Sequence, residues 1–76
     1  MTTYVLSQQP EGWQVHRYSD AISLIGMAHT EDQARAMAFE RAQKDAPAAV
    51  LRVGMNGESR FIAMIGDSDA GVRSHF

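Results

Sequence analysis

Residues 30–45 read TEDQARAMAFERAQKD, and this stretch decides the fold because it is the clearest local signal in the chain. Thr30 followed by Gln33 matches a capping box, and the two acidic residues between them lie in the first turn, where the helix dipole favours negative charge. Pro47 ends the segment because the residue before a proline is pushed out of the helical region. The sequence therefore predicts a helix over residues 31 to 44 or 45.

The buried side of this helix is predicted to carry small side chains at its centre. Ala34, Ala38 and Ala42 recur at intervals of four and so share one face, with Met37 and Phe39 to either side. Because alanine extends no further than its Cβ, such a stripe allows the helix to pack close against a sheet.

Three strands are predicted before the helix. Residues 4–8 and 13–18 flank QPEG at 9–12, in which proline presets the first turn residue and glycine tolerates a left-handed backbone, so the two segments form a hairpin. Residues 21–28 follow a short polar break. They are apolar on both faces and short, which favours a third strand.

Two further strands are predicted after the helix. Residues 49–55 and 58–65 flank Asn-Gly at 56–57, the dipeptide best suited to a two-residue type I′ turn. Counting outward from this turn places Arg52 opposite Phe61, where the guanidinium can stack on the ring.

The element order βββαββ predicts an α+β domain over residues 1–65, with an antiparallel sheet of about five strands and one helix packed on one face. The order third, second, first, fifth, fourth is the predicted strand order, because it keeps every neighbouring pair antiparallel. Residues 66–76 are polar and punctuated by glycine, and we expect them to form a flexible C-terminal tail.

One helix about 10 Å wide cannot cover five strands spaced about 4.8 Å apart. Alternation along the strands predicts that one apolar set faces the helix: Leu6, Trp13, Val15, Ile22, Leu24, Leu51, Val53, Ile62 and Met64. A second set, which includes Val5, points away. Its other members, together with Arg52, are predicted to form an interaction surface: Tyr18, Ile25, Met27, Val50, Arg52, Phe61 and Ile65.

Monomeric proteins rarely expose apolar patches larger than a few hundred Å², so we expect this second face to be covered. A homodimer, formed sheet to sheet or through edge strands, is the predicted cover. The alternative is that the tail, residues 66–76, folds back over the face. The sequence identifies no other protein partner.

Charge and composition exclude several classes of protein. The 76 residues carry seven basic and nine acidic side chains, a formal net charge of −2, and no cysteine. A chain without a basic excess lacks the electrostatic term that dominates nucleic-acid affinity, so nucleic acid is not the expected partner. No uncharged run is longer than ten residues, the length of residues 21–30, which is too short to cross a bilayer, and the N-terminus lacks the pattern of a signal peptide. We expect a cytoplasmic protein that does not contact membranes.

No catalytic, metal or cofactor site is predicted. His16, His29 and His75 lack metal-ligand spacing, and the acidic run at 67–69 lacks the glycine and glutamate positions of a calcium loop. No serine lies in a nucleophile elbow, and no glycine loop is placed to hold a phosphate. The expected function is therefore that of a non-catalytic interaction or assembly module acting as a homodimer, not an enzyme.

The main alternative is a nucleic-acid-binding module that uses the exposed sheet face. Gln14, His16 and Tyr18 share one side of their strand, and Arg17 and Arg52 lie near them in the predicted sheet. Sheets that bind single-stranded nucleic acid combine stacking aromatic rings with arginines in this way. A small enzyme is a third, weaker alternative.

Several motifs also resemble a known family. Pro-Glu-Gly-Trp-Gln-Val at 10–15, a Thr-x-x-Gln-Ala helix start at 30–34 followed by Ala38 and Ala42, and a strand that ends in Asn-Gly at 56–57 are similar to the bacterial family called domain of unknown function 2188. The resemblance covers roughly residues 4–62. It implies the same hairpin, helix and hairpin order and a bacterial, cytoplasmic origin, and it carries no functional residue.

Overall fold

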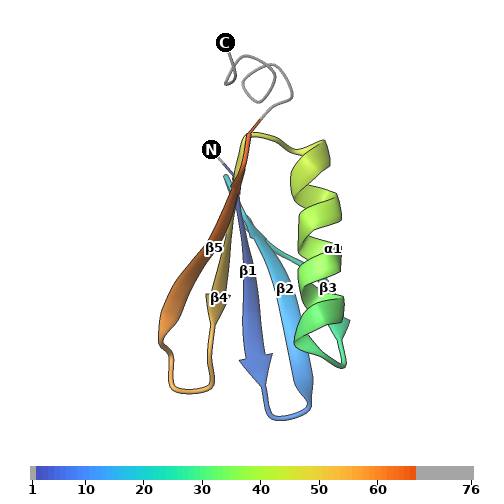
Figure 1. The fold of residues 1–76 in the computed structure, drawn as a ribbon, viewed down its shortest axis with the longest axis vertical. Helices are drawn as coiled ribbons and strands as arrows, with labels where there is room; N and C mark the ends of the chain where they lie inside the picture. Colours follow the sequence, from blue (N-terminus) through green and yellow to red (C-terminus); the bar gives the residue numbers. More distant parts are fainter. Residues whose placement is uncertain (1, 67–76) are drawn as a thin grey trace.

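The computed structural model describes residues 2–66 and contains five strands and one helix (Figure 1). In chain order these are β1 (Thr2–Gln9), β2 (Gly12–Tyr18), β3 (Ile22–Ala28), α1 (Glu31–Lys44), β4 (Ala48–Val53) and β5 (Ser59–Ile65). The α+β class and the predicted order βββαββ are confirmed. The tail predicted over residues 66–76 lies outside the described residues, except for Gly66.

The helix begins and ends where the sequence predicts. The Thr30 hydroxyl accepts a hydrogen bond from the Gln33 amide at 3.1 Å, and the Gln33 side chain accepts one from the His29 amide at 3.0 Å. At the other end Asp45 is the C-cap, and its amide donates to the Ala42 carbonyl. Both ends of α1 are therefore capped, which fixes where the helix meets the sheet.

The five strands form one mixed sheet in the order β3-β2-β1-β4-β5. All neighbouring pairs are antiparallel except β1 and β4, which are parallel. The predicted all-antiparallel sheet, with the last two strands exchanged, is wrong. The burial of these strands gives the reason: Ala48, Ala49 and Val50 are buried on both faces of β4, as a central strand requires, whereas β5 begins with exposed Ser59 and Arg60 and suits an edge.

The two hairpins differ in how well their turns follow the prediction. Gln9 lies opposite Gly12 across a two-residue turn, as predicted. The second turn is one residue longer, because the Gly57 amide donates to the Gly54 carbonyl and the Gly54 amide donates to the Glu58 carbonyl, each at 2.9 Å. Gly57 has a φ of 85°, but no non-glycine residue in the described chain has a positive φ, so the type I′ turn is wrong.

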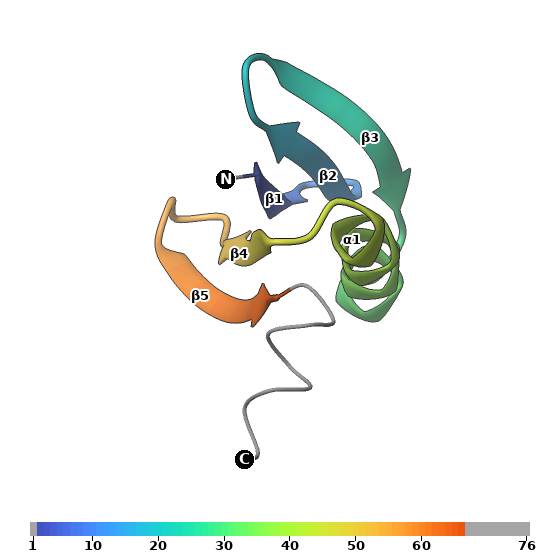
Figure 2. The same cartoon turned by 90° about the horizontal axis from the view of Figure 1, so that it is seen from above.

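The core lies between α1 and one face of the sheet, as Figure 2 shows from above. Ala34, Ala38 and Ala42 are fully buried, which confirms the predicted stripe. They pack against a set of side chains from β1, β2 and β4: Tyr4, Leu6, Trp13, Val15, Ala48 and Val50. No second layer lies on the other side of the sheet within the described residues.

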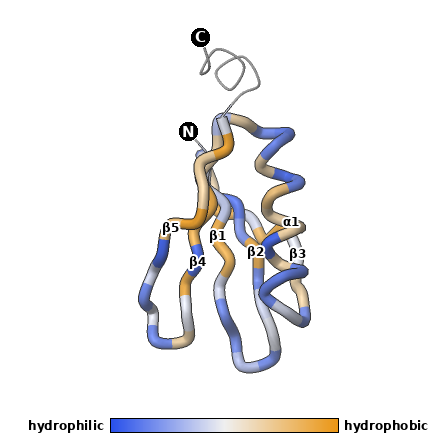
Figure 3. Tube along the Cα trace, viewed as in Figure 1, coloured by the Kyte–Doolittle hydropathy of each residue, from blue (hydrophilic) through white to orange (hydrophobic). Residues whose placement is uncertain are grey.

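Apolar residues are distributed along the strands and not only along the side covered by α1. In Figure 3 the colour changes within each turn of α1, from apolar on one side of the helix to polar on the other, and apolar segments also occur in the central and edge strands. A search of residues 2–66 finds no helix with the length and hydropathy needed to cross a membrane.

Candidate functional site

The strand register divides the sheet into a side covered by α1 and an uncovered side, which we call the open face. Directly paired residues on neighbouring strands point to the same side of a sheet. Leu6 and Val15 are paired and both lie in the core under α1. Their chain neighbours Val5 and His16 are also paired and therefore lie on the open face.

Three cross-strand rows make up the open face. The first runs from β3 to β5 through Leu24, His16, Val5, Leu51 and Phe61. The second runs through Ile22, Tyr18, Thr3, Ala49 and Met64, and the third through Met27, Gln14, Ser7, Val53 and Ser59. The first two rows are largely apolar from one edge of the sheet to the other.

Large apolar side chains stand exposed at the two edges of the open face. Ile22, Leu24 and Met27 on β3 are between 55% and 64% exposed, and Phe61 and Met64 on β5 are 58% and 50% exposed. The middle of the face is different, because Val5 and Ala49 are only 8% exposed even though no helix covers them. The open face thus has two apolar ridges with a lower floor of small residues between them.

Two β-bulges decide which apolar residues reach this face. The register of β2 and β3 shifts so that Ile25 has no partner, and that of β4 and β5 shifts so that Ile62 has none. Both side chains pack against the core under α1. Beyond each bulge the alternation is reversed relative to a regular strand, which turns Ile22 and Leu24 to the open face.

The structure divides the predicted interaction surface between the two sides of the sheet. Tyr18, Met27 and Phe61 lie on the open face, as the sequence placed them. Val50 is wrongly placed by the sequence: it is fully buried under α1, because β4 pairs with β1 and sets Val50 beside Tyr4.

Three more placements require correction. Ile25 packs against the core because of the bulge, and Ile65 does so because it pairs with core residue Ala48. Arg52 lies on the α1 side. The placement of Ile22, Leu24, Leu51, Val53 and Met64 toward the helix is also wrong, since their register partners lie on the open face.

Arg52 is held in a cluster at the N-terminal end of α1. Its guanidinium carbon lies 5.1 Å from the centroid of the Trp13 ring, and its Nε donates to Glu31 at 3.1 Å. Arg35 donates to the same Glu31 oxygen at 2.9 Å. The predicted stacking on Phe61 is therefore wrong, because the longer turn places Arg60 opposite Arg52.

Charged residues are absent from the open face as the register defines it. None of the fifteen residues in the three rows is an aspartate, glutamate, lysine or arginine. Its polar-aromatic part is an edge-on contact between His16 and Tyr18, with ring centroids 6.4 Å apart. Arg17 and Arg52, which the sequence grouped with these rings, lie on the α1 side and bind carboxylates there.

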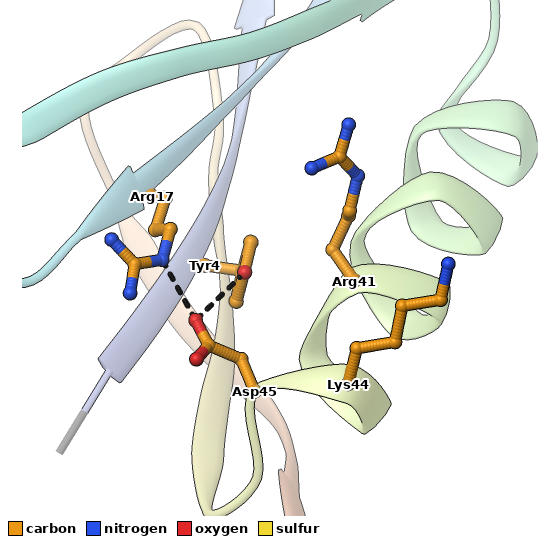
Figure 4. A pocket seen from close by; sticks show the side chains of 5 residues that line it. All are labelled: Tyr4, Arg17, Arg41, Lys44 and Asp45. Carbon is orange, nitrogen blue, oxygen red and sulfur yellow. Dashed lines mark hydrogen bonds and ion pairs between the residues drawn. The ribbon is translucent and has the colours of Figure 1, made fainter.

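A hollow lies on the α1 side of the sheet, at the C-terminal end of the helix (Figure 4). Asp45 accepts two hydrogen bonds on one carboxylate oxygen, from Arg17 Nε at 2.7 Å and from the Tyr4 hydroxyl at 3.0 Å. The hydrogen bond from Arg17 lowers the pKa of Asp45, and Tyr4 lowers it further. Burial raises the pKa of Tyr4, and its bond to Asp45 acts in the same direction. At neutral pH this triad is an ionised carboxylate between a cation and a neutral phenol.

Two more cations line the same hollow, which has a volume of about 270 Å³. Arg41 and Lys44 leave the last turns of α1, and neither is drawn in contact with Asp45 in Figure 4. Neither has an ion-pair partner among residues 2–66. The sequence reasoning missed this site, because Tyr4 and Arg17 are 41 and 28 positions from Asp45.

Metal ligands do not gather in the described part of the chain: no group of three histidine, cysteine, aspartate or glutamate side chains lies close enough there to hold an ion. His16 and His29 lie on different elements. His75 and the acidic run at 67–69 lie outside the described residues.

Comparison with known proteins finds no match, whether among family models, curated proteins or solved structures.

Proposed function

We propose that this protein is a non-catalytic interaction module that functions as a homodimer, with the open faces of two copies packed together. The observation that carries the proposal is the position of the exposed apolar side chains. Six of the seven large apolar residues that are exposed in residues 2–66 lie on this one face: Tyr18, Ile22, Leu24, Met27, Phe61 and Met64. Scattered apolar residues need no explanation, but these six residues of β2, β3 and β5 belong to one sheet face, on which two largely apolar rows cross all five strands, and such a face is typical of an interface.

The shape and charge of the open face favour a second copy as the occupant. In a two-fold interface the same patch meets itself, so it must be complementary to itself. A ridge from one copy can pack beside the ridges of its partner and above the floor formed by Val5 and Ala49. Since the three rows carry no charged side chain, two identical faces also meet without like-charge repulsion.

The C-terminal residues are a poorer cover on compositional grounds. Residues 67–76 read DSDAGVRSHF, with two aspartates and one arginine. Val72 and Phe76 are their only large apolar side chains. Two such residues offer much less apolar area than the six that the open face exposes, so the balance of area favours a second copy.

Nucleic acid is the alternative partner, but the lack of positive charge on the open face disfavours it. Base stacking on His16 and Tyr18 would need nearby cations to hold the phosphate backbone. Within residues 2–66, Arg17 and Arg52 lie on the other side of the sheet and are paired with Asp45 and Glu31. The open face therefore lacks the electrostatic part of such a site.

A bacterial, cytoplasmic setting and kinship with the domain of unknown function 2188 family belong to the same proposal. The motifs at 10–15, 30–34 and 56–57 support the kinship, and the lack of cysteine is compatible with a reducing compartment.

Sedimentation velocity over a micromolar concentration series tests the proposal. The wild type is expected to sediment as a dimer and Phe61→Glu as a folded monomer, because a dimer would bury two uncompensated carboxylates. Met55→Glu is the matched control: Met55 is 57% exposed and Phe61 58%, but Met55 lies in the turn between β4 and β5. A monomeric wild type, or a Phe61→Glu variant that dimerises like Met55→Glu, overturns the proposal. Oligonucleotide binding that weakens with added salt would favour the nucleic-acid alternative.

A further inference from the structure

His16 lies in the interior of the open face. It belongs to β2, an inner strand of the sheet, and to the middle one of the three rows, between the row of Tyr18 and the row of Gln14. Its direct partners are Val5 on β1 and Leu24 on β3, and its side chain is half-buried. Among the fifteen residues of the three rows, it is the only one of a type that changes charge near neutral pH.

No group that faces His16 within residues 2–66 can neutralise a positive charge on it. On its own strand, Tyr18 contacts the imidazole edge-on, with ring centroids 6.4 Å apart, and presents a phenol, which is neutral in acid. The residues of β1 and β3 that face it carry no titratable or charged side chain. Arg17 and Asp45 form an ion pair on the α1 side, and the charged residues of α1 lie across the sheet from His16.

A dimer formed through the open faces encloses two copies of this side chain. A neutral imidazole can lie among apolar groups, whereas an imidazolium loses its hydration there and gains no carboxylate in return. Two imidazolium groups in one interface also repel each other. Separate copies therefore bind protons more readily than the dimer does, so a fall in pH favours the separate copies.

We propose that the proton on His16 controls assembly, so that the homodimer forms at neutral pH and separates in mildly acidic solution. This inference rests on the proposed function, because it concerns the interface formed by the open face. Histidine ordinarily titrates near pH 6.5, whereas aspartate and glutamate titrate near 3.9 and 4.3. Between pH 7.5 and pH 5.5, each imidazole that is neutral in the dimer raises the dissociation constant by about tenfold, and the two together raise it by about 100-fold.

Sedimentation velocity on dilution series at pH 7.5 and pH 5.5, at equal ionic strength, tests the proposal. The dissociation constant of the wild type is expected to rise by about 100-fold at the lower pH, with circular dichroism showing a folded chain at both. His16→Gln removes the titrating group and retains His29 and His75, so its dissociation constant should stay nearly constant. His29→Gln is the matched control: His29 is exposed in the connection between β3 and α1, and this variant should respond like the wild type.

The outcomes separate this inference from the proposed function. A wild type that is monomeric at pH 7.5 overturns both. A wild type that dimerises with the same dissociation constant at both pH values overturns the pH response alone, and so does a His16→Gln variant that responds like the wild type.

A second measurement needs no substitution at His16. In NMR titrations, the midpoint of the His16 ring protons is expected about one pH unit or more lower in concentrated wild type than in Phe61→Glu, whereas the midpoint of His29 stays the same. Residue 61 lies three strands from His16 in the same row, about 14 Å at ~4.8 Å per strand, so its carboxylate is largely screened at 0.15 M salt, where the Debye length is about 8 Å. Equal His16 midpoints in the two samples overturn the proposal.

Discussion

Val50 and Leu51 are neighbours on β4 that the structure places on opposite sides of the sheet, so replacing each with alanine tests the register directly. Val50 is fully buried beside Tyr4 and Ala63, whereas Leu51 is half-buried on the open face between Val5 and Phe61. Any shift of the register by one residue would exchange these environments.

The expected cost of Val50→Ala follows from its burial. The two methyl groups that it loses contribute about 0.8 kcal/mol each, and a residual cavity of roughly 40 Å³ adds about 1 kcal/mol at ~24 cal/mol per Å³. The free energy of unfolding should therefore fall by about 2 to 3 kcal/mol, which lowers the melting temperature by about 10 to 20 °C in a domain of this size. Leu51→Ala should cost less, about 1.5 kcal/mol in a monomer, because part of that side chain already contacts water and its loss from an open face leaves no enclosed cavity.

The assay is urea unfolding followed by circular dichroism, with both substitutions made in the Phe61→Glu background so that association does not contribute. In the background with Phe61 intact, Leu51→Ala should also weaken self-association and Val50→Ala should not. The register is refuted if Leu51→Ala costs more than Val50→Ala, or if the two variants lose equal stability.

Three further predictions concern the helix cap, the first hairpin and the triad of Tyr4, Arg17 and Asp45. Thr30→Ala should lower the free energy of unfolding by about 1 kcal/mol in urea titrations, since it removes the N-cap hydrogen bond, while Thr30→Ser should restore most of it. Gly12→Ala should be more harmful than a surface substitution in a thermal melt, because Gly12 has a φ of 149° and an added Cβ would lie 2.6 Å from the Ala28 carbonyl oxygen; wild-type stability in this variant would contradict the β2–β3 geometry. The pKa of Asp45 is lowered on folding, so its ion pair with Arg17 stabilises the protein above about pH 5 and loses this effect as the pH falls through the lowered pKa. The difference in unfolding free energy between wild type and Asp45→Asn should accordingly shrink in acid, and a difference that stays constant down to pH 2 would contradict it.

Features that depend on a few neighbouring residues could be read from the sequence. The helix bounds follow from Thr30, Gln33 and Pro47, and the buried stripe follows from alanines four positions apart. The first hairpin follows from its turn residues. Each of these signals is local, because the interacting groups are within a few positions of one another.

Features that depend on pairing between distant segments could not be read in this way. Val50 and Leu51 are both apolar, so alternation alone does not say which faces the helix. The bulges that remove Ile25 and Ile62 from the ladder leave no mark in an apolar run, yet they reverse the sides of Ile22 and Leu24. The burial of β4 on both faces, which places it next to β1, became evident only in the folded chain.

The open face and the hollow at the end of α1 also differ in how far the sequence could predict them. An uncovered apolar face follows from the geometric shortfall of one helix against five strands. The structure retains such a face, but four of its seven predicted members lie on the α1 side: Ile25, Val50, Arg52 and Ile65. The triad of Tyr4, Arg17 and Asp45 left no sequence signal beyond an aspartate at the end of a helix. Its members meet only because β1 and β2 pair and α1 ends above them.

Self-association through the open face is tested most directly by isotope-filtered nuclear Overhauser spectroscopy on an equal mixture of labelled and unlabelled chains. Such spectra report only contacts between different copies. Cross-peaks between copies are expected at Leu24, Leu51 and Phe61, and none at Ala38, which is fully buried within one copy. An absence of cross-peaks between copies at concentrations where the wild type is fully folded, or cross-peaks confined to the α1 side, would contradict it.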